Sequence, residues 1–205
     1  MYPSVGIARP RLKPDVPEAE GHMIRHSPLD LTLLALDRDG RADLMAAIPG
    51  LREAPEEGPT TLSELISARR RARPAVGEMD GWTILIDTLF AVPDQAEVVH
   101  RATRGRNGHA FLWQAASGSH GFGAHHDGAV YRSAFRSGGE WMIDAGEALP
   151  EEAGLPFVED PEGALAELAS RLTGLDLGDD AIWELPLTPL VKAPRPSKAG
   201  RALGR

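Results

Sequence analysis

Four histidines and an aspartate lie close together in the middle of the chain. His109, His120, His125 and His126 fall within eighteen residues, and Asp127 follows directly. Strand residues an even number apart point to the same side, so His120 and His126 should share a sheet face that His109 could join from a neighbouring strand. Imidazole and carboxylate groups are zinc ligands. His109, His120, His126 and Asp127 could therefore hold zinc, or they could be polar positions on a half-solvated sheet.

A second candidate set consists of aspartates next to apolar strands. Asp37 and Asp87 each end an apolar run, and Asp80 precedes one. If the two strands are neighbours, we expect the carboxylates at one sheet edge, where they could bind magnesium or form an acid/base pair. Aspartate at a strand end also commonly begins a turn.

The charge distribution is the most distinctive feature of the sequence. The chain has a formal net charge of −8, but the segment from Glu140 to Glu184 has thirteen acidic residues against the single Arg171, a local net of −12. Such a segment repels itself unless basic groups lie against it. A basic partner protein, which an acidic surface would attract electrostatically, is one source of those groups, and a solvated acidic surface is the alternative. The candidate partner-binding residues are Glu151, Glu152, Glu159 and Asp160.

Several classes of chemistry lack their sequence signatures. The chain has no cysteine, which excludes disulfides, thiolate metal sites and a cysteine nucleophile. We find no GxxxxGK[ST], GxGxxG, HExxH or GxSxG motif. The negative overall charge disfavours nucleic acid as a partner. The sequence thus predicts no catalytic residue and no cofactor apart from the zinc considered above.

The elements that must position these residues are short strands and helices. The runs at 31–37 and 82–88 predict buried strands, and 109–144 predicts a four-stranded antiparallel meander with a turn at Asp127-Gly128. Helices are expected after Arg41, after Thr61 with a Thr61–Glu64 capping box, after Asp94, and from Asp160 to Gly174. A last edge strand is expected at 181–187.

Together these elements predict one α+β domain with a mostly antiparallel sheet and three or four helices on one face. The domain should span residues 28–190, between a Pro-rich N-terminal arm (1–27) and a basic C-terminal tail (191–205). No apolar run is long enough for a membrane span or a signal peptide, so we expect a cytoplasmic protein.

The segments DGWTILIDT, SGSHGFGAHHDGAVYR, GEALPEE and LASRLTGLDLGDD lie within about residues 80–180. On these segments the chain resembles uncharacterised proteins of actinobacteria. Some proteins of this kind are similar to immunity proteins that neutralise toxins. The resemblance carries no catalytic residue.

The function expected from the sequence is a non-enzymatic, cytoplasmic interaction protein that binds a basic partner through its acidic face, in the manner of an immunity-type inhibitor. Two alternatives remain open. The Pro-rich arm and basic tail would suit a structural or accessory subunit of a larger multi-copy assembly. The histidine cluster would suit a metal-dependent enzyme.

Overall fold

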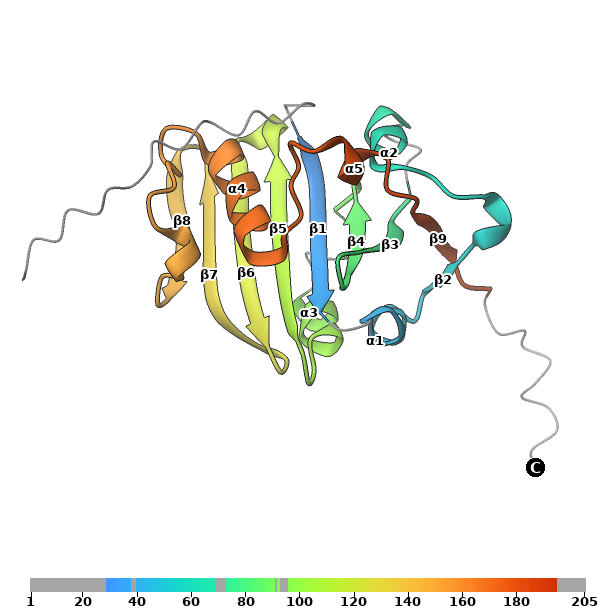
Figure 1. The fold of residues 1–205 in the computed structure, drawn as a ribbon. Helices are drawn as coiled ribbons and strands as arrows, with labels where there is room; N and C mark the ends of the chain where they lie inside the picture. The colour runs from blue at the N-terminus through green and yellow to red at the C-terminus, as the bar shows by residue number, and fades with distance from the viewer. Residues whose placement is uncertain (1–28, 38–39, 69–72, 91, 93–95, 195–205) are drawn as a thin grey trace, which may run out of the picture.

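The chain folds around one antiparallel sheet of nine strands. The computed structural model describes residues 29–37, 40–68, 73–90, 92 and 96–194. The strand order is β2-β9-β3-β4-β1-β5-β6-β7-β8, and every neighbouring pair is antiparallel (Figure 1). The expected α+β class with a mostly antiparallel sheet is confirmed.

The strands are β1 (Asp30–Asp37), β2 (Leu51–Glu53), β3 (Ala75–Met79), β4 (Trp82–Asp87), β5 (Asn107–Gln114), β6 (Ser119–His126), β7 (Ala129–Ser137), β8 (Glu140–Gly146) and β9 (Thr188–Lys192). The α-helices are α1 (Arg41–Ala47), α2 (Leu62–Ala68), α3 (Ala96–Ala102), α4 (Pro161–Thr173) and α5 (Asp180–Trp183). Single turns of 3-10 helix are η1 (Pro55–Glu57), η3 (Ala115–Ser117) and η4 (Pro150–Glu152).

Helices cover both faces of the sheet. Leu31, Leu33 and Ala35 of β1 pack in one apolar core with residues of α2, α4 and α5. Leu34 and Leu36, which point to the opposite face, pack in a second core with residues of α1 and α3. The helices are therefore divided between the two faces, whereas the sequence suggested one. Because β1 is buried on both faces, it reads as a continuous apolar run.

Several local signals in the sequence produce the expected elements. Thr61 and Glu64 form the capping box, since each side chain accepts a hydrogen bond from the other residue's backbone N–H. Helix α4 begins where the Asp160 carboxylate accepts from the Gly163 N–H at 3.0 Å, and it ends at Gly174 with φ 75°. The four strands of the meander pair in sequence from β5 to β8.

The end of the chain differs from the expectation. Residues 181–187 do not form an edge strand, because Asp179 caps a short helix, α5, by accepting from the Ala181 N–H at 2.9 Å. The last strand is β9, which lies inside the sheet between β2 and β3. Val191 and Lys192, assigned above to the basic tail, belong to this strand.

Some expectations concern residues outside the described ranges. These are the arm at residues 1–27, most of the tail at 191–205 and the helix start at Asp94. Within the described part of the chain, no helix is long and apolar enough to span a bilayer.

Candidate functional site

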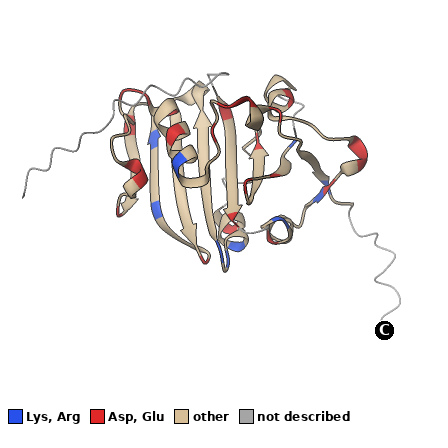
Figure 2. Ribbon diagram, in the orientation of Figure 1, with Lys and Arg blue, Asp and Glu red and all other residues tan. Residues whose placement is uncertain are grey.

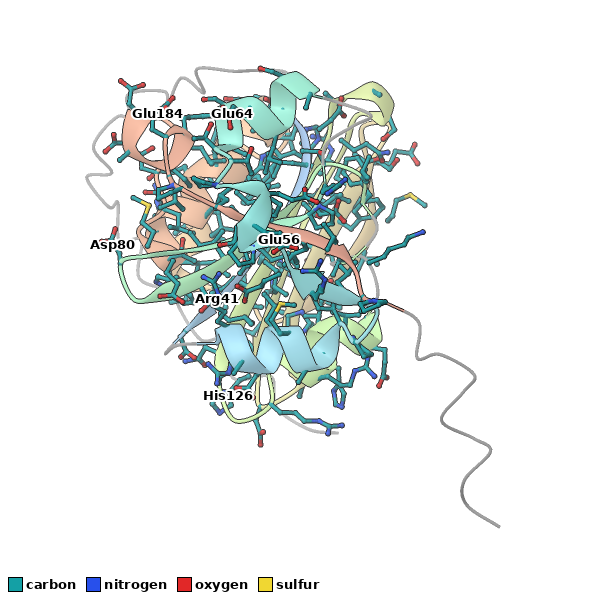
Figure 3. The ribbon with its side chains drawn as sticks, turned by 90° about the vertical axis from the view of Figure 1, so that its right-hand side faces the viewer. Arg41, Glu56, Glu64, Asp80, His126 and Glu184 are labelled. Carbon is teal, nitrogen blue, oxygen red and sulfur yellow. The ribbon has the colours of Figure 1, made fainter. Side chains whose placement is uncertain are left out.

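The histidines and aspartate singled out for metal binding do not converge. His109 lies opposite Ala124, and His126 lies opposite Asn107, so both occupy one end of the β5–β6 pair. His120 is six residues from His126 on the same strand, roughly 20 Å away at the usual rise. His126 Nδ1 contacts the Asn107 side-chain oxygen at 2.8 Å, at the bottom of the molecule in Figure 3.

Asp127 also has a local role in the β6–β7 turn. Its carboxylate accepts from the Gly105 backbone N–H at 2.8 Å, and its own φ is 48°. No group of three or more His, Asp or Glu side chains within the described ranges is placed to hold a metal ion. The zinc site considered from the sequence is therefore not assembled by this geometry.

His109 and His120 lie on the face of the sheet that α4 covers, in partly apolar surroundings. The His109 ring lies 5.6 Å from Trp82 and 6.4 Å from Phe111, centroid to centroid. Burial, assisted by His125, lowers the pKa of His109 to about 4. Burial also lowers the pKa of His120, which borders a void of about 10 Å³, about the space for one water. These imidazoles are neutral at pH 7.

The aspartate pair expected at one sheet edge is separated by the strand direction. Strands β1 and β4 are neighbours, but they run antiparallel, with Asp37 opposite Trp82 and Asp87 opposite Thr32. The two carboxylates therefore lie at opposite ends of the strand pair and cannot act together. Asp87 is fully buried and accepts from the backbone N–H groups of Leu89 (2.8 Å) and Val92 (2.9 Å).

Two of the four candidate partner-binding carboxylates hold the protein's own structure together. Glu152 forms a bidentate pair with Arg132 of β7, with both N–O distances at 2.8 Å. Asp160 caps α4. Glu151 and Glu159 make no ion pair among the described residues. These two remain available to a partner.

Basic residues near the acidic segment are largely occupied by internal contacts. Arg132 also contacts Asp144 at 2.5 Å, and Arg136 donates to the carbonyls of Gly139, Phe157 and Val158. Figure 2 shows the acidic positions on the segments around β8 and α4, with basic positions inside β7. The acidic segment therefore retains a net negative surface after its internal pairs are formed.

Strand β8 gives this surface an apolar centre that the sequence analysis did not identify. The strand ends the sheet order, and all seven of its residues are exposed. Trp141, Met142 and Ile143 are 45%, 63% and 46% exposed. Six of the seven large exposed apolar side chains in the described residues lie on β7, on β8 or at Val158. The sequence signal was the apolar triplet between Glu140 and Asp144 in the last meander strand.

We call the exposed residues of β8 together with Glu147, Glu151 and Glu159 the β8 surface. It combines a strand edge that no other described strand pairs with, three successive exposed apolar residues, and the carboxylates of Glu140, Glu147, Glu151 and Glu159, which make no ion pair among the described residues; Asp144 is paired with Arg132. Exposed apolar patches with polar surroundings are typical of protein interaction sites. The β8 surface is the candidate functional site.

The fold and this surface define an α+β protein with a nine-stranded antiparallel sheet and one exposed, acidic sheet edge. Comparison with protein-family models, curated proteins and solved structures found no match.

Proposed function

We propose that the chain is a non-enzymatic interaction protein that binds a basic protein through the β8 surface. The observation that carries the proposal is the edge of β8, which pairs with no further strand in the described part of the chain and where Trp141, Met142 and Ile143 are exposed beside carboxylates. An exposed edge strand can pair with an extended segment of another chain through backbone hydrogen bonds. Its apolar side chains would contribute buried area on binding.

The charge of the β8 surface favours a basic partner over a second copy of the chain. Two β8 edges paired antiparallel would bring Glu140 of each copy close to Glu147, just after β8, of the other. Like charges on adjacent strands destabilise pairing. A basic partner would instead be drawn to Glu147, Glu151 and Glu159, which have no ion pair among the described residues. An inhibitor of immunity type that covers a cationic surface of a toxin fits this chemistry.

Site-specific cross-linking tests whether a partner contacts the β8 edge. A photo-reactive amino acid replaces Met142 in the full chain, and captured proteins are identified after illumination in the native cell. We expect covalent capture of one basic protein, with cross-links mapped to an extended segment of it. The matched control places the same group at Glu56, an exposed residue of η1 beyond the other end of the sheet (Figure 3).

The proposal requires two results from the cross-linking experiment. Capture at position 142 must exceed capture at position 56, and it must fall when the cells are lysed into high salt before illumination. Equal capture at both positions, or a captured protein that is acidic, would overturn it. Capture of a second copy of the chain would show that β8 mediates a homodimer and not the binding of a basic partner.

A further inference from the structure

A large groove lies at the opposite end of the sheet from β8. It has a volume of about 1070 Å³ and lies between the α1–β2 connection, β9 and the segment that leads into α3. Apolar residues from both sides line it, including Ile48, Leu51, Val98 and Leu190. Ile48, Val98 and Leu190 belong to the second core and are at most 4% exposed, so the groove lies directly over this core. The volume is sufficient for a ligand of moderate size with a long apolar part.

The polar residues on this groove are mostly cationic, in a chain whose net charge is −8. Among the described lining residues, Arg73, Arg101 and Lys192 are basic and Glu57, which pairs with Arg73, is the single acidic one. Two cations on the groove have donors that no described residue engages. Arg101 donates from Nη2 to the Ala47 carbonyl at 2.8 Å, whereas its Nε, 3.8 Å from Glu97, has no hydrogen-bond partner among the described residues. Lys192 makes no ion pair with any described residue.

The geometry points to a binding site for an amphipathic small molecule, namely a linear acyl chain that ends in a carboxylate. The acyl chain would lie along Leu51, Leu89 and Val191, the apolar lining residues that are at least partly exposed, above the buried Ile48, Val98 and Leu190. The carboxylate would be held by Arg101 and Lys192 through charge-assisted hydrogen bonds. An apolar pocket with a few convergent polar groups is the usual form of such sites.

Other occupants fit the groove less well. The chain continues from Ala193, on the groove wall, into a segment with Arg195, Lys198, Arg201 and Arg205. Cations of that segment repel the cations of the groove. An acidic peptide would satisfy Arg101 and Lys192 but would leave the apolar lining against polar backbone, which is unfavourable. A single terminal charge on an apolar chain matches both parts of the lining.

Binding of dodecanoate to the full chain, measured by calorimetry below the micellar concentration, tests this site. Dodecanol is the matched uncharged probe. We expect saturable 1:1 binding of dodecanoate, at least about tenfold tighter than that of dodecanol because the alcohol lacks the charge-assisted bonds. Methyl NMR signals of Val98 and Leu190 should shift on titration, which would place the ligand in the groove.

Three variants and a control complete the test. Lys192→Gln and Arg101→Gln should each weaken dodecanoate about tenfold and leave dodecanol unchanged. Gly50→Phe should weaken both probes, because Gly50 lines the groove, a Cβ there meets no atom within 4 Å, and a phenyl ring at this position would compete with the ligand for space. Arg52→Gln is the control, since Arg52 pairs with Glu56 and does not line the groove.

Each remaining outcome would contradict the inference. Equal affinity for dodecanoate and dodecanol would show that Arg101 and Lys192 do not bind the carboxylate. An equal loss of dodecanoate affinity in the Arg52→Gln variant would show a non-specific charge effect. Absence of saturable binding, or methyl shifts at residues other than Val98 and Leu190, would show that the groove does not bind dodecanoate. Binding of an acidic peptide there without binding of dodecanoate would assign the groove to another ligand class.

Discussion

Arg132 of β7 and Glu152 of η4 form a buried bidentate ion pair that fastens the segment after β8 to the sheet. The Nε–Oε1 and Nη2–Oε2 distances are both 2.8 Å, and the side chains are 6% and 11% exposed. Glu152 also accepts from the Leu149 N–H at 2.7 Å. The contact with Glu152 raises the pKa of Arg132, so the guanidinium stays charged at every accessible pH. Part of the acidic segment is therefore neutralised within the chain.

Replacing Glu152 should cost much more stability than replacing its neighbour. Glu152→Gln leaves Arg132 buried with only Asp144 as a charged partner, and we expect a loss of about 2–3 kcal/mol in the free energy of unfolding. Glu151→Gln, the matched control, removes a carboxylate without an ion pair and should change stability by less than about 0.5 kcal/mol. Urea denaturation measures both. Similar losses for the two variants would show that the Arg132–Glu152 pair does not stabilise the fold.

Asp160 should act as a helix cap rather than as a partner contact. Asp160→Ala removes the acceptor for the Gly163 N–H, and we expect a loss of about 1 kcal/mol in the free energy of unfolding. Asp160→Ser retains a capping oxygen and should recover most of it. The measurement is thermal or urea unfolding of both variants. An unchanged stability of the alanine variant would contradict the capping role.

Asp87 should behave as a turn residue rather than as an acid or base. Asp87→Asn keeps one acceptor oxygen, so one of the bonds from Leu89 and Val92 is lost inside a buried turn. We expect a loss of about 1–2 kcal/mol in unfolding free energy. Asp80→Asn is the control, since Asp80 is exposed and asparagine tolerates its φ of 51°. Equal stabilities of the two variants in urea would refute this role.

The free energy of unfolding should decrease as the pH is lowered, because the pKa of His109 is lower in the folded chain than in the unfolded one. An unfolded histidine has a pKa near 6.5, whereas burial lowers the pKa of His109 to about 4. Between these values the unfolded chain binds a proton that the folded chain does not, so stability is lost as the pH falls from about 6.5 to 4. His109→Phe, which retains the ring packing, should reduce the loss between pH 7 and 4.5 by about 2 kcal/mol.

Urea unfolding at the two pH values, compared between the native chain and His109→Phe, isolates this contribution from that of the carboxylates. An identical pH dependence in both proteins would mean that folding leaves the pKa of His109 at its unfolded value.

Elements with local signals could be predicted from the sequence. Helix α4 has its cap at Asp160, a proline at its first position and Gly174 at its end, and all three lie within the element or beside it. The hairpin at Asp127-Gly128 is likewise set by two residues with positive φ. Such signals act over one turn of chain, so the sequence displays them directly.

The predictions that were wrong concern how segments distant in the sequence lie relative to one another. Asp37 and Asp87 each end a strand as predicted, but the antiparallel direction of β1 and β4 separates them. Strand β9 depends on pairing with β2 and β3, which lie more than a hundred residues earlier. Its place between them has no local signal. Nor could the position of β8 at the end of the described sheet be predicted, because it depends on the order of all nine strands.

The affinity of the cross-linked partner for charge variants of the β8 surface tests the central proposal most directly. The partner identified at position 142 is purified, and its Kd for the full chain is measured at low and moderate salt. We expect the Kd of the Glu151→Gln/Glu159→Gln variant to rise about tenfold at low salt and to converge with that of the native chain as salt rises. Asp80→Asn, a control outside the surface, should bind as the native chain does. A Kd unchanged by the double substitution and by salt would contradict the proposal.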